Sequence, residues 1–168
     1  MRVVEKAEAL ALLERHMARF AEGACPICLM VLPAHGAEAI ASNEHAVVLL
    51  NRFAQRRAHL LVASREHVEH VHQMDWTAYS AMQQLAHQAS CVVQRLFSPE
   101  RVFIALLGRS SLPPVPSYAH LHVHVIPVYE RDERARPARV LSWGEGVVIY
   151  EDVEARALAD QLRAAWNP

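Results

Sequence analysis

Apolar side chains recur at helical spacing in three segments of the chain. The segments are residues 3–21, residues 68–97, which form the longest of the three, and residues 153–166. In the first segment the apolar positions include Val4, Leu10, Leu13, Met17 and Phe20, and Gly23 follows. Because residues three or four apart share one face of a helix, each segment predicts an amphipathic helix.

Short apolar runs between polar residues predict the strands. They occupy residues 39–42, 46–51, 59–63, 102–107, 117–127 and 147–150. Helices interrupt these strands instead of alternating with each one, which predicts an α+β fold built mainly on an antiparallel sheet. The charged stretch 130–139 is expected to lie exposed, because its opposite charges nearly balance and solvation alone accounts for them.

One predicted strand carries an unusual row of histidines. Because successive side chains of a strand point to opposite faces, His120, His122 and His124 are expected on one surface. The aliphatic residues between them then face the core, namely Leu121, Val123 and Val125. Three imidazoles on one face give up the contacts that valine or isoleucine would make, so the row indicates function. It could bind a metal ion, transfer protons or supply a neutral nitrogen nucleophile.

Cys25 and Cys28 form a second chemical signal. Their spacing lets two thiolates reach one zinc ion, which prefers four tetrahedral ligands. Such a pair is equally typical of a redox dithiol or of two small residues in a core. His67 and His120 could complete a Cys2His2 set from other elements, so a structural zinc site is the favoured interpretation.

Composition and charge exclude several functions. The 168 residues are 52% hydrophobic, which fits one globular domain with a sizeable core. The formal net charge of -1 predicts neither a nucleic-acid polymer nor a membrane surface as partner. Charged residues scattered through the N-terminal segment predict no secretion signal, and we expect no segment long enough to span a bilayer. The three cysteines, an odd number, favour a reducing, cytoplasmic setting.

The histidine row also resembles a known motif. His120-Leu121-His122-Val123-His124-Val125-Ile126 matches the pattern His-φ-His-φ-His-φ-φ, with φ apolar, of the histidine triad (HIT) nucleotide-binding proteins. The order of four further segments is similar to that in the zinc-containing branch of this family: Cys25-Pro26-Ile27-Cys28, Leu50-Asn51-Arg52-Phe53, His59-Leu60-Leu61-Val62 and Arg65-Glu66-His67-Val68. The resemblance covers residues 24–128.

For the fold, the resemblance implies one HIT-like domain over residues 1–168, with a long helix packed on the sheet. Further helices are expected at both ends, and residues 129–168 form a C-terminal extension. For the metal, it implies structural zinc held by Cys25, Cys28, His67 and His120. Such a metal would orient the strand that carries the nucleophile and would not touch the substrate.

For the chemistry, the resemblance implies that His122 attacks the α-phosphate of a nucleotide and forms a nucleotidyl-histidine. The other nitrogen of His122 would donate a hydrogen bond, with a backbone carbonyl as the expected acceptor. His124 would donate to a phosphate oxygen, and Ser117 would approach the bridging oxygen of the leaving group. Asn51 would bind the ribose. We expect Leu29, Leu49 and Leu61 to line the binding site of the base.

The chain departs from the family pattern near the site. Ala58 stands where many relatives have glycine, and Pro116 stands where a glutamine commonly precedes the serine. The loop of residues 108–117 also contains Pro113 and Pro114 and is expected to be rigid. Substrate choice therefore does not follow from the resemblance.

Three functions are compatible with these residues. The favoured one is a hydrolase or phosphorylase that acts on a dinucleoside polyphosphate or a nucleoside phosphoramidate through His122. A metallohydrolase would instead use His120, His122 and His124 as ligands of a catalytic zinc ion. A non-enzymatic nucleotide sensor or protein-interaction module would keep the same fold and pocket. Relatives commonly form homodimers, and the apolar helices at both ends of the chain offer surfaces for one.

Overall fold

The computed structural model describes residues 1–18, 25–31, 39–108 and 119–166, and its strands form two antiparallel sheets. The larger sheet has the order β2 (Ala39–Ser42), β3 (Ala46–Leu50), β5 (Leu60–Ser64), β7 (His122–Val128) and β6 (Arg101–Ala105). The smaller sheet has the order β1 (Arg2–Val4), β8 (Val147–Ile149) and β4 (Phe53–Ala54). The predicted α+β fold is confirmed.

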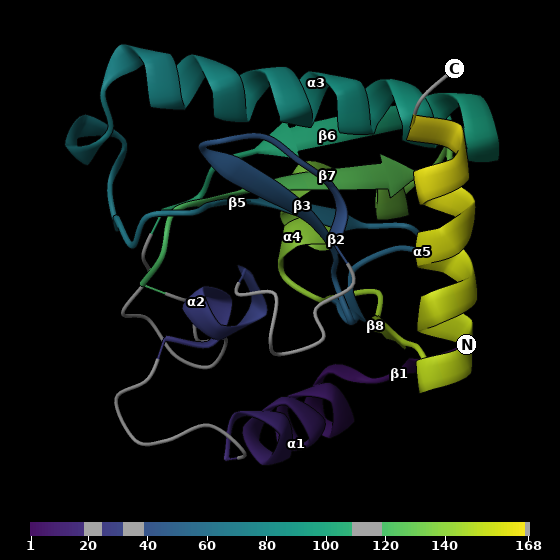
Figure 1. The fold of residues 1–168 in the computed structure, drawn as a ribbon. Helices are drawn as coiled ribbons and strands as arrows, with labels where there is room; N and C mark the ends of the chain where they lie inside the picture. The colour runs from purple at the N-terminus through teal and green to yellow at the C-terminus, as the bar shows by residue number, and fades with distance from the viewer. Residues whose placement is uncertain (19–24, 32–38, 109–118, 167–168) are drawn as a thin grey trace.

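The main core lies on one face of the larger sheet. Helix α3 (Trp76–Phe97) lies along this face and α5 (Asp152–Trp166) lies beside it at the end of the strands (Figure 1). The core includes Val48, Val62, Met82, Leu85, Leu158 and Leu162. It also includes the aliphatic residues of the histidine segment, Leu121, Val123 and Val125, none of which is more than 1% exposed. The predicted two-sided character of this segment is therefore confirmed.

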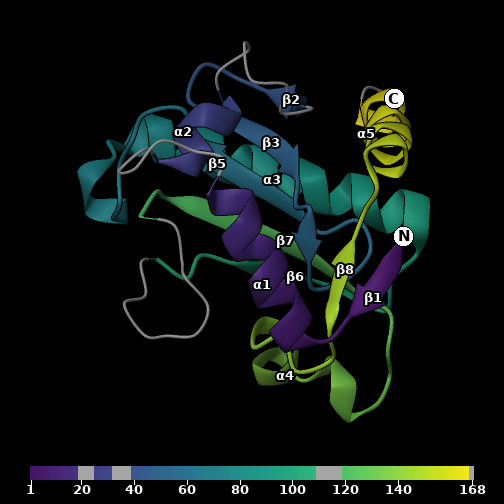
Figure 2. The same cartoon turned by 90° about the horizontal axis from the view of Figure 1, so that it is seen from below.

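The opposite face of the larger sheet carries the histidines. At one end α2 (Pro26–Val31) covers Val47, Leu49 and Ala63, and at the other end η3 (Glu133–Ala135) and α4 (Pro137–Leu141) cover Ile126 and Val128. Figure 2 shows this side, with α2 and α4 at different ends of the strands. His122 lies opposite Ala63, and His124 lies opposite Leu61 and Ala105. The two histidines thus occupy the part of β7 between two covered regions.

The N-terminal helix differs from its prediction. Residues 2–4 form strand β1, which pairs with β8, and α1 (Lys6–Met17) begins only after Glu5. Val4 belongs to a small core with Ala9, Leu13, Trp143 and Val147. Its apolar side chain is therefore buried from a strand and does not lie on the face of a helix. Phe20 and Gly23 lie outside the described residues.

The long helix begins later than predicted. The carboxylate of Asp75 accepts a hydrogen bond from the backbone N–H of Ala78 at 2.8 Å and caps the first turn of α3. The residues before it form a short 3-10 helix, η2 (Val71–Gln73). No helix in the described ranges is both long and apolar enough to cross a lipid bilayer.

The charged stretch 130–139 is more than a solvated segment. Most of its residues are exposed as predicted, but Ala135 is buried, and Val140 is buried just beyond the stretch. The Arg56 Nε lies 2.8 Å from Glu130 Oε1, and both side chains are largely buried. The stretch is therefore attached to the body of the protein by apolar contacts and by an ion pair, which corrects the prediction.

Candidate functional site

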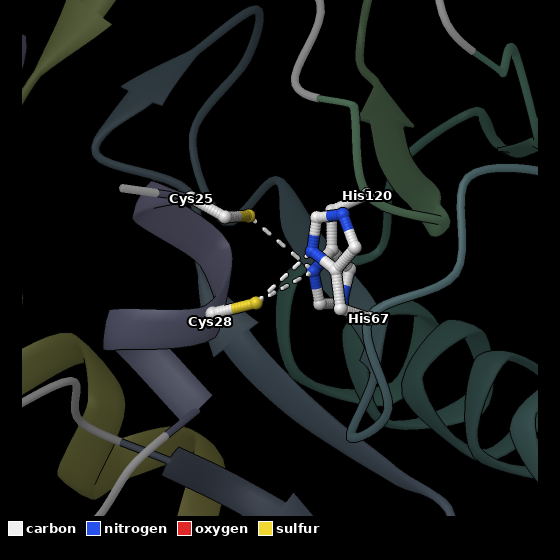
Figure 3. Close-up of side chains that lie close together, drawn as sticks. All are labelled: Cys25, Cys28, His67 and His120. Carbon is white, nitrogen blue, oxygen red and sulfur yellow. Dashed lines mark hydrogen bonds between the residues drawn. The ribbon is translucent and has the colours of Figure 1, made fainter. Parts of the chain in front are cut away.

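The four predicted metal ligands converge from three parts of the chain. Cys25 and Cys28 lie at the start of α2, His67 follows β5, and His120 precedes β7 (Figure 3). Their ligand atoms all lie within 4.8 Å of one another. Nδ1 of His120 is 3.5 Å from Sγ of Cys25 and 3.4 Å from Sγ of Cys28, and Nδ1 of His67 is 3.1 Å from Sγ of Cys28. Since a tetrahedral zinc ion separates a sulfur and a nitrogen ligand by about 3.6 Å, the cluster has the size of a zinc site.

His120 has the tautomer that a metal ligand needs. Its Nε2 lies 2.8 Å from the backbone carbonyl oxygen of Ser64, which only accepts hydrogen bonds. The proton therefore resides on Nε2, and the lone pair of Nδ1 faces the two cysteines. The side chain is 2% exposed, and this burial lowers the pKa of His120, so the imidazole is neutral.

Cys28 needs a positive charge nearby in order to ionise. Burial, followed by the neighbouring thiol of Cys25, raises the pKa of Cys28 to about 11. A thiolate is thus unfavourable there without a positive charge close by, and a bound divalent cation supplies such a charge. The donor set of two cysteine sulfurs and two imidazole nitrogens fits zinc.

His122 is held with one nitrogen protonated. Its Nδ1 lies 2.7 Å from the backbone carbonyl oxygen of His120, so Nδ1 donates and Nε2 carries the lone pair. This confirms the backbone carbonyl predicted as its partner. His122 is 8% exposed, and burial lowers its pKa below the ordinary value, so the ring is neutral near pH 7. A neutral imidazole with a defined basic nitrogen is able to act as a nucleophile.

His124 is oriented by a chain of hydrogen bonds. The backbone N–H of Gln55 and the side-chain amide of Asn51 point to Nδ1 of His59, at 3.4 and 3.1 Å. The Asn51 oxygen accepts from the backbone N–H of Phe53, which fixes the orientation of that amide. Nδ1 of His59 is therefore an acceptor and its Nε2 donates to Nδ1 of His124 at 3.1 Å. The remaining proton of His124 lies on Nε2 as a donor.

This pair of histidines is neutral. Burial, and then the electrostatic effect of His122, lowers the pKa of His124 to about 3. Burial also lowers the pKa of His59 well below its ordinary value, and His124 adds to that effect. The pair therefore presents a neutral hydrogen-bond donor throughout the physiological pH range.

The structure brings together most of the predicted site residues. His122 and His124 lie side by side, with ring centroids 4.8 Å apart, and His120 links them to the metal ligands. The predicted ribose ligand Asn51 donates to His59, a contact that the sequence did not predict. Ser117 and the prolines of its loop lie outside the described residues.

His59 is a member of this hydrogen-bonded site that the sequence pattern does not single out. The segment beginning at His59 contributes to the family resemblance, but the sequence pattern alone gives no role to His59 itself. A signal was present, because His59 is a polar residue at the start of an otherwise apolar run. It is completely buried, and a buried polar group generally has hydrogen-bond partners.

The apolar residues predicted to contact a base lie close to this site. Leu49 pairs with Leu61, and Leu61 pairs with His124, so their side chains share one face of the sheet. Leu29 lies in α2, the helix whose Ile27 and Val31 pack against Leu49 on that face. The site therefore combines hydrogen-bonding histidines with an apolar border.

Comparisons with known proteins agree with this arrangement. The fold is similar to a Zn-bound histidine triad family protein from Mycobacterium smegmatis, with 18% identity over 85% of this chain and 93% of that chain and a TM-score of 0.65. It is also similar to a hypothetical histidine triad nucleotide-binding protein from Sulfolobus tokodaii, with 17% identity over 84% and 91% of the two chains and a TM-score of 0.66. No curated protein sequence matches the chain. The HIT domain matches residues 34–131, more than half of the chain, which therefore belongs to the HIT domain family.

Proposed function

We propose that the protein binds nucleotides and cleaves them at the α-phosphate through a covalent intermediate on His122. The substrate is a dinucleoside polyphosphate or a nucleoside phosphoramidate, and the second acceptor is water or inorganic phosphate. The observation that carries this proposal is the tautomer of two adjacent histidines. Nδ1 of His122 donates a hydrogen bond and leaves a basic Nε2, whereas Nδ1 of His124 accepts one and leaves a donating Nε2.

In the first step Nε2 of His122 attacks the α-phosphorus. A phosphorus–nitrogen bond forms, the bond from phosphorus to the leaving group breaks, and its electron pair departs with that group, which in a phosphoramidate also takes up a proton from solvent. The imidazole then carries a positive charge because both of its nitrogens are substituted or protonated. The carbonyl oxygen of His120, 2.7 Å from Nδ1, stabilises this charge.

In the second step water or phosphate attacks the same phosphorus. The phosphorus–nitrogen bond breaks, its electron pair returns to Nε2 of His122, and the acceptor gives up its proton to solvent. The product is a nucleoside monophosphate with water and a nucleoside diphosphate with phosphate. Two displacements thus replace a single difficult one.

His124 stabilises the charge on the phosphoryl oxygens in both steps. Its Nε2–H is a donor because His59 occupies Nδ1. The donor is ready before the substrate binds, so no proton needs to move before the reaction. Leu61, which pairs with His124 on the same face of the sheet, then borders the nucleotide base.

The metal site would fix the residue that orients the nucleophile. Cys25, Cys28, His67 and His120 would hold zinc, which when bound supplies a cross-link between α2, the segment after β5 and the start of β7. The side chain of His120 faces this cluster and its carbonyl faces His122. Fixing His120 therefore fixes the hydrogen bond that selects the nucleophilic nitrogen.

The hydrogen bonds disfavour a catalytic zinc ion held by the histidine row. Nδ1 of His122 donates to a carbonyl, and Nδ1 of His124 accepts from His59. Within the described part of the chain, the cluster of ligand atoms contains His120 and neither of the other two. A binding module without turnover and a homodimer are both compatible with the fold, and the experiment below separates the first from an enzyme.

The proposal is tested by product analysis. The protein is incubated with diadenosine polyphosphate or adenosine phosphoramidate, with and without phosphate, and the products are separated. We expect turnover that His122→Ala abolishes and that His72→Ala, a substitution at an exposed histidine outside the site, leaves unchanged. AMP in both conditions indicates a hydrolase, and phosphate-dependent ADP indicates a phosphorylase. Nucleotide binding without turnover in the wild type would contradict the enzymatic proposal and favour a binding module.

A further inference from the structure

The C-terminal extension holds the segment that carries His59. The HIT domain match ends at residue 131, and the extension continues through β8 and α5. β8 pairs with β4, which places the extension beside residues 53–54. Further along the segment, Nη2 of Arg56 donates to the carbonyl oxygen of Arg134 at 3.2 Å. Residues outside the matched domain therefore contact the loop that leads to the site.

One of these contacts lies directly beside His59. The backbone N–H of Ala58 donates to the hydroxyl of Tyr150 at 2.9 Å. Ala58 is completely buried and Tyr150 is 5% exposed, so water has little access to this bond. Without the hydroxyl, the N–H of Ala58 loses its partner in a buried place.

Ala58 also has a backbone conformation that needs support. Its φ is 62°, in the left-handed region where a Cβ atom is unfavourable and glycine is the usual residue. Residues in such conformations persist when the surrounding structure holds them. The tyrosine hydroxyl is one such restraint, and it acts on the residue adjacent to His59.

The position of His59 determines whether Nε2 of His124 is a hydrogen-bond donor. His59 Nε2 donates to His124 Nδ1 at 3.1 Å, and a shift of the backbone at Ala58 would lengthen this bond. We propose that Tyr150 is a positioning residue, whose hydroxyl holds Ala58 in its left-handed conformation and thereby holds His59 against His124. Its predicted effect on turnover rests on the proposed function above, whereas its effect on the two histidine rings does not.

The substitution Tyr150→Phe tests this inference, because it removes the hydroxyl and keeps the ring. We expect kcat to fall by about 10- to 100-fold with little change in KM, since His124 remains present but misplaced. Tyr129→Phe is the matched control, because the Tyr129 hydroxyl donates to the carbonyl of Arg57 in the same loop. That variant should keep its kcat within about twofold, since the lost bond is exposed.

A second substitution separates positioning from general loss of stability. Glycine adopts the left-handed region without strain, so Ala58→Gly should restore much of the kcat that Tyr150→Phe loses. A merely structural role of Tyr150 predicts no such rescue, because glycine adds no contact and increases the freedom of the unfolded chain.

Nitrogen-15 NMR of the histidine rings gives a readout that needs no turnover. In the wild type we expect Nδ1 of His124 to be an unprotonated acceptor and Nε2 to be protonated. Tyr150→Phe should shift these signals and produce a mixture of tautomers, and Tyr129→Phe should not. Unchanged signals in Tyr150→Phe together with unchanged kcat would overturn the inference. If the wild type turns over no substrate, the spectra alone decide whether Tyr150 positions the two histidine rings.

Amide hydrogen exchange of the unaltered protein covers the case in which Tyr150→Phe does not fold. The amide proton of Ala58 should exchange slowly with deuterium, because it is buried and bonded to the hydroxyl. Rapid exchange of this proton in the folded protein would overturn the proposed restraint.

Discussion

The carbonyl oxygen of His120 accepts a hydrogen bond from Nδ1 of His122 at 2.7 Å, so the first histidine of the row fixes the proton of the second. The side chain of His120 lies in the Cys/His cluster at the same time. One residue thus connects the candidate metal ligands to the proposed nucleophile through its own backbone. His120 lies just before β7, so its backbone carbonyl lies beside the first residue of that strand.

Removal of the metal should destabilise the protein. We expect chelation, or His67→Ala, to abolish bound zinc and to lower Tm by about 10 °C, because binding to a preformed four-ligand site adds its free energy to folding. Zinc content and thermal unfolding measure both effects. Cys91→Ser is the matched control, since Cys91 is an exposed cysteine away from the cluster. Loss of turnover with an unchanged Tm would instead indicate a catalytic metal.

Asn51 should act on turnover more than on nucleotide affinity. Asn51→Ala removes the amide that donates to His59, so the donor tautomer of His124 becomes less fixed. We expect kcat to fall by about tenfold, the effect of a lost hydrogen bond of about 1.4 kcal/mol, with KM nearly unchanged. A raised KM with intact kcat, together with lost discrimination against deoxyribonucleotides, would support ribose binding instead.

Stability should fall as the pH decreases from about 6.5 towards 3. The pKa of His124 is lowered from 6.5 to about 3 by burial and by His122. Between these values the unfolded chain binds a proton that the folded protein does not, so unfolding becomes easier as the pH falls. For His124 the slope is about 1.4 kcal/mol per pH unit.

The contribution of His124 is isolated by substitution. The free energy of unfolding in urea, measured from pH 7 to pH 4, should depend less steeply on pH in His124→Asn. His72→Asn, a substitution at an exposed position, should keep the wild-type slope. Equal slopes in His124→Asn and the wild type would contradict the neutral state of this histidine.

Glu130 should contribute to stability although it begins a strongly charged stretch. Glu130→Ala leaves Arg56, which is 7% exposed, as a buried cation without its carboxylate. We expect a loss of about 3 kcal/mol in the free energy of unfolding. The adjacent Arg131 forms an ion pair with Glu100 while its side chain is 83% exposed, so Arg131→Ala should change stability little. Similar small effects of both substitutions would contradict the structural role of the buried pair.

Local periodicity explains which features could be predicted. The alternation from His120 to Val125 predicts its two faces, because neighbouring residues of a strand determine that pattern by themselves. The three-residue strand β1 has no such pattern. It exists because residues 2–4 pair with residues 147–149, a contact between the two ends of the chain that no local window contains.

The functional site shows the same limit. The spacing of Cys25 and Cys28 and the family resemblance are enough to predict the four residues that converge in the candidate metal cluster. The role of His59 depends on the pairing of β5 with β7, and the role of Tyr150 depends on a hydrogen bond across 92 positions of the chain. Tertiary contacts of this kind are fixed by the folded register, which sequence patterns do not give.

The covalent intermediate is the most direct test of the account. The protein is mixed with α-labelled substrate, quenched within milliseconds to seconds, digested and analysed by mass spectrometry. The account predicts an acid-labile nucleotidyl group on the peptide that contains His122, present in His72→Ala and absent from His122→Ala. Substrate turnover in the wild type that persists in His122→Ala, with no adduct on either protein, would contradict nucleophilic catalysis by His122.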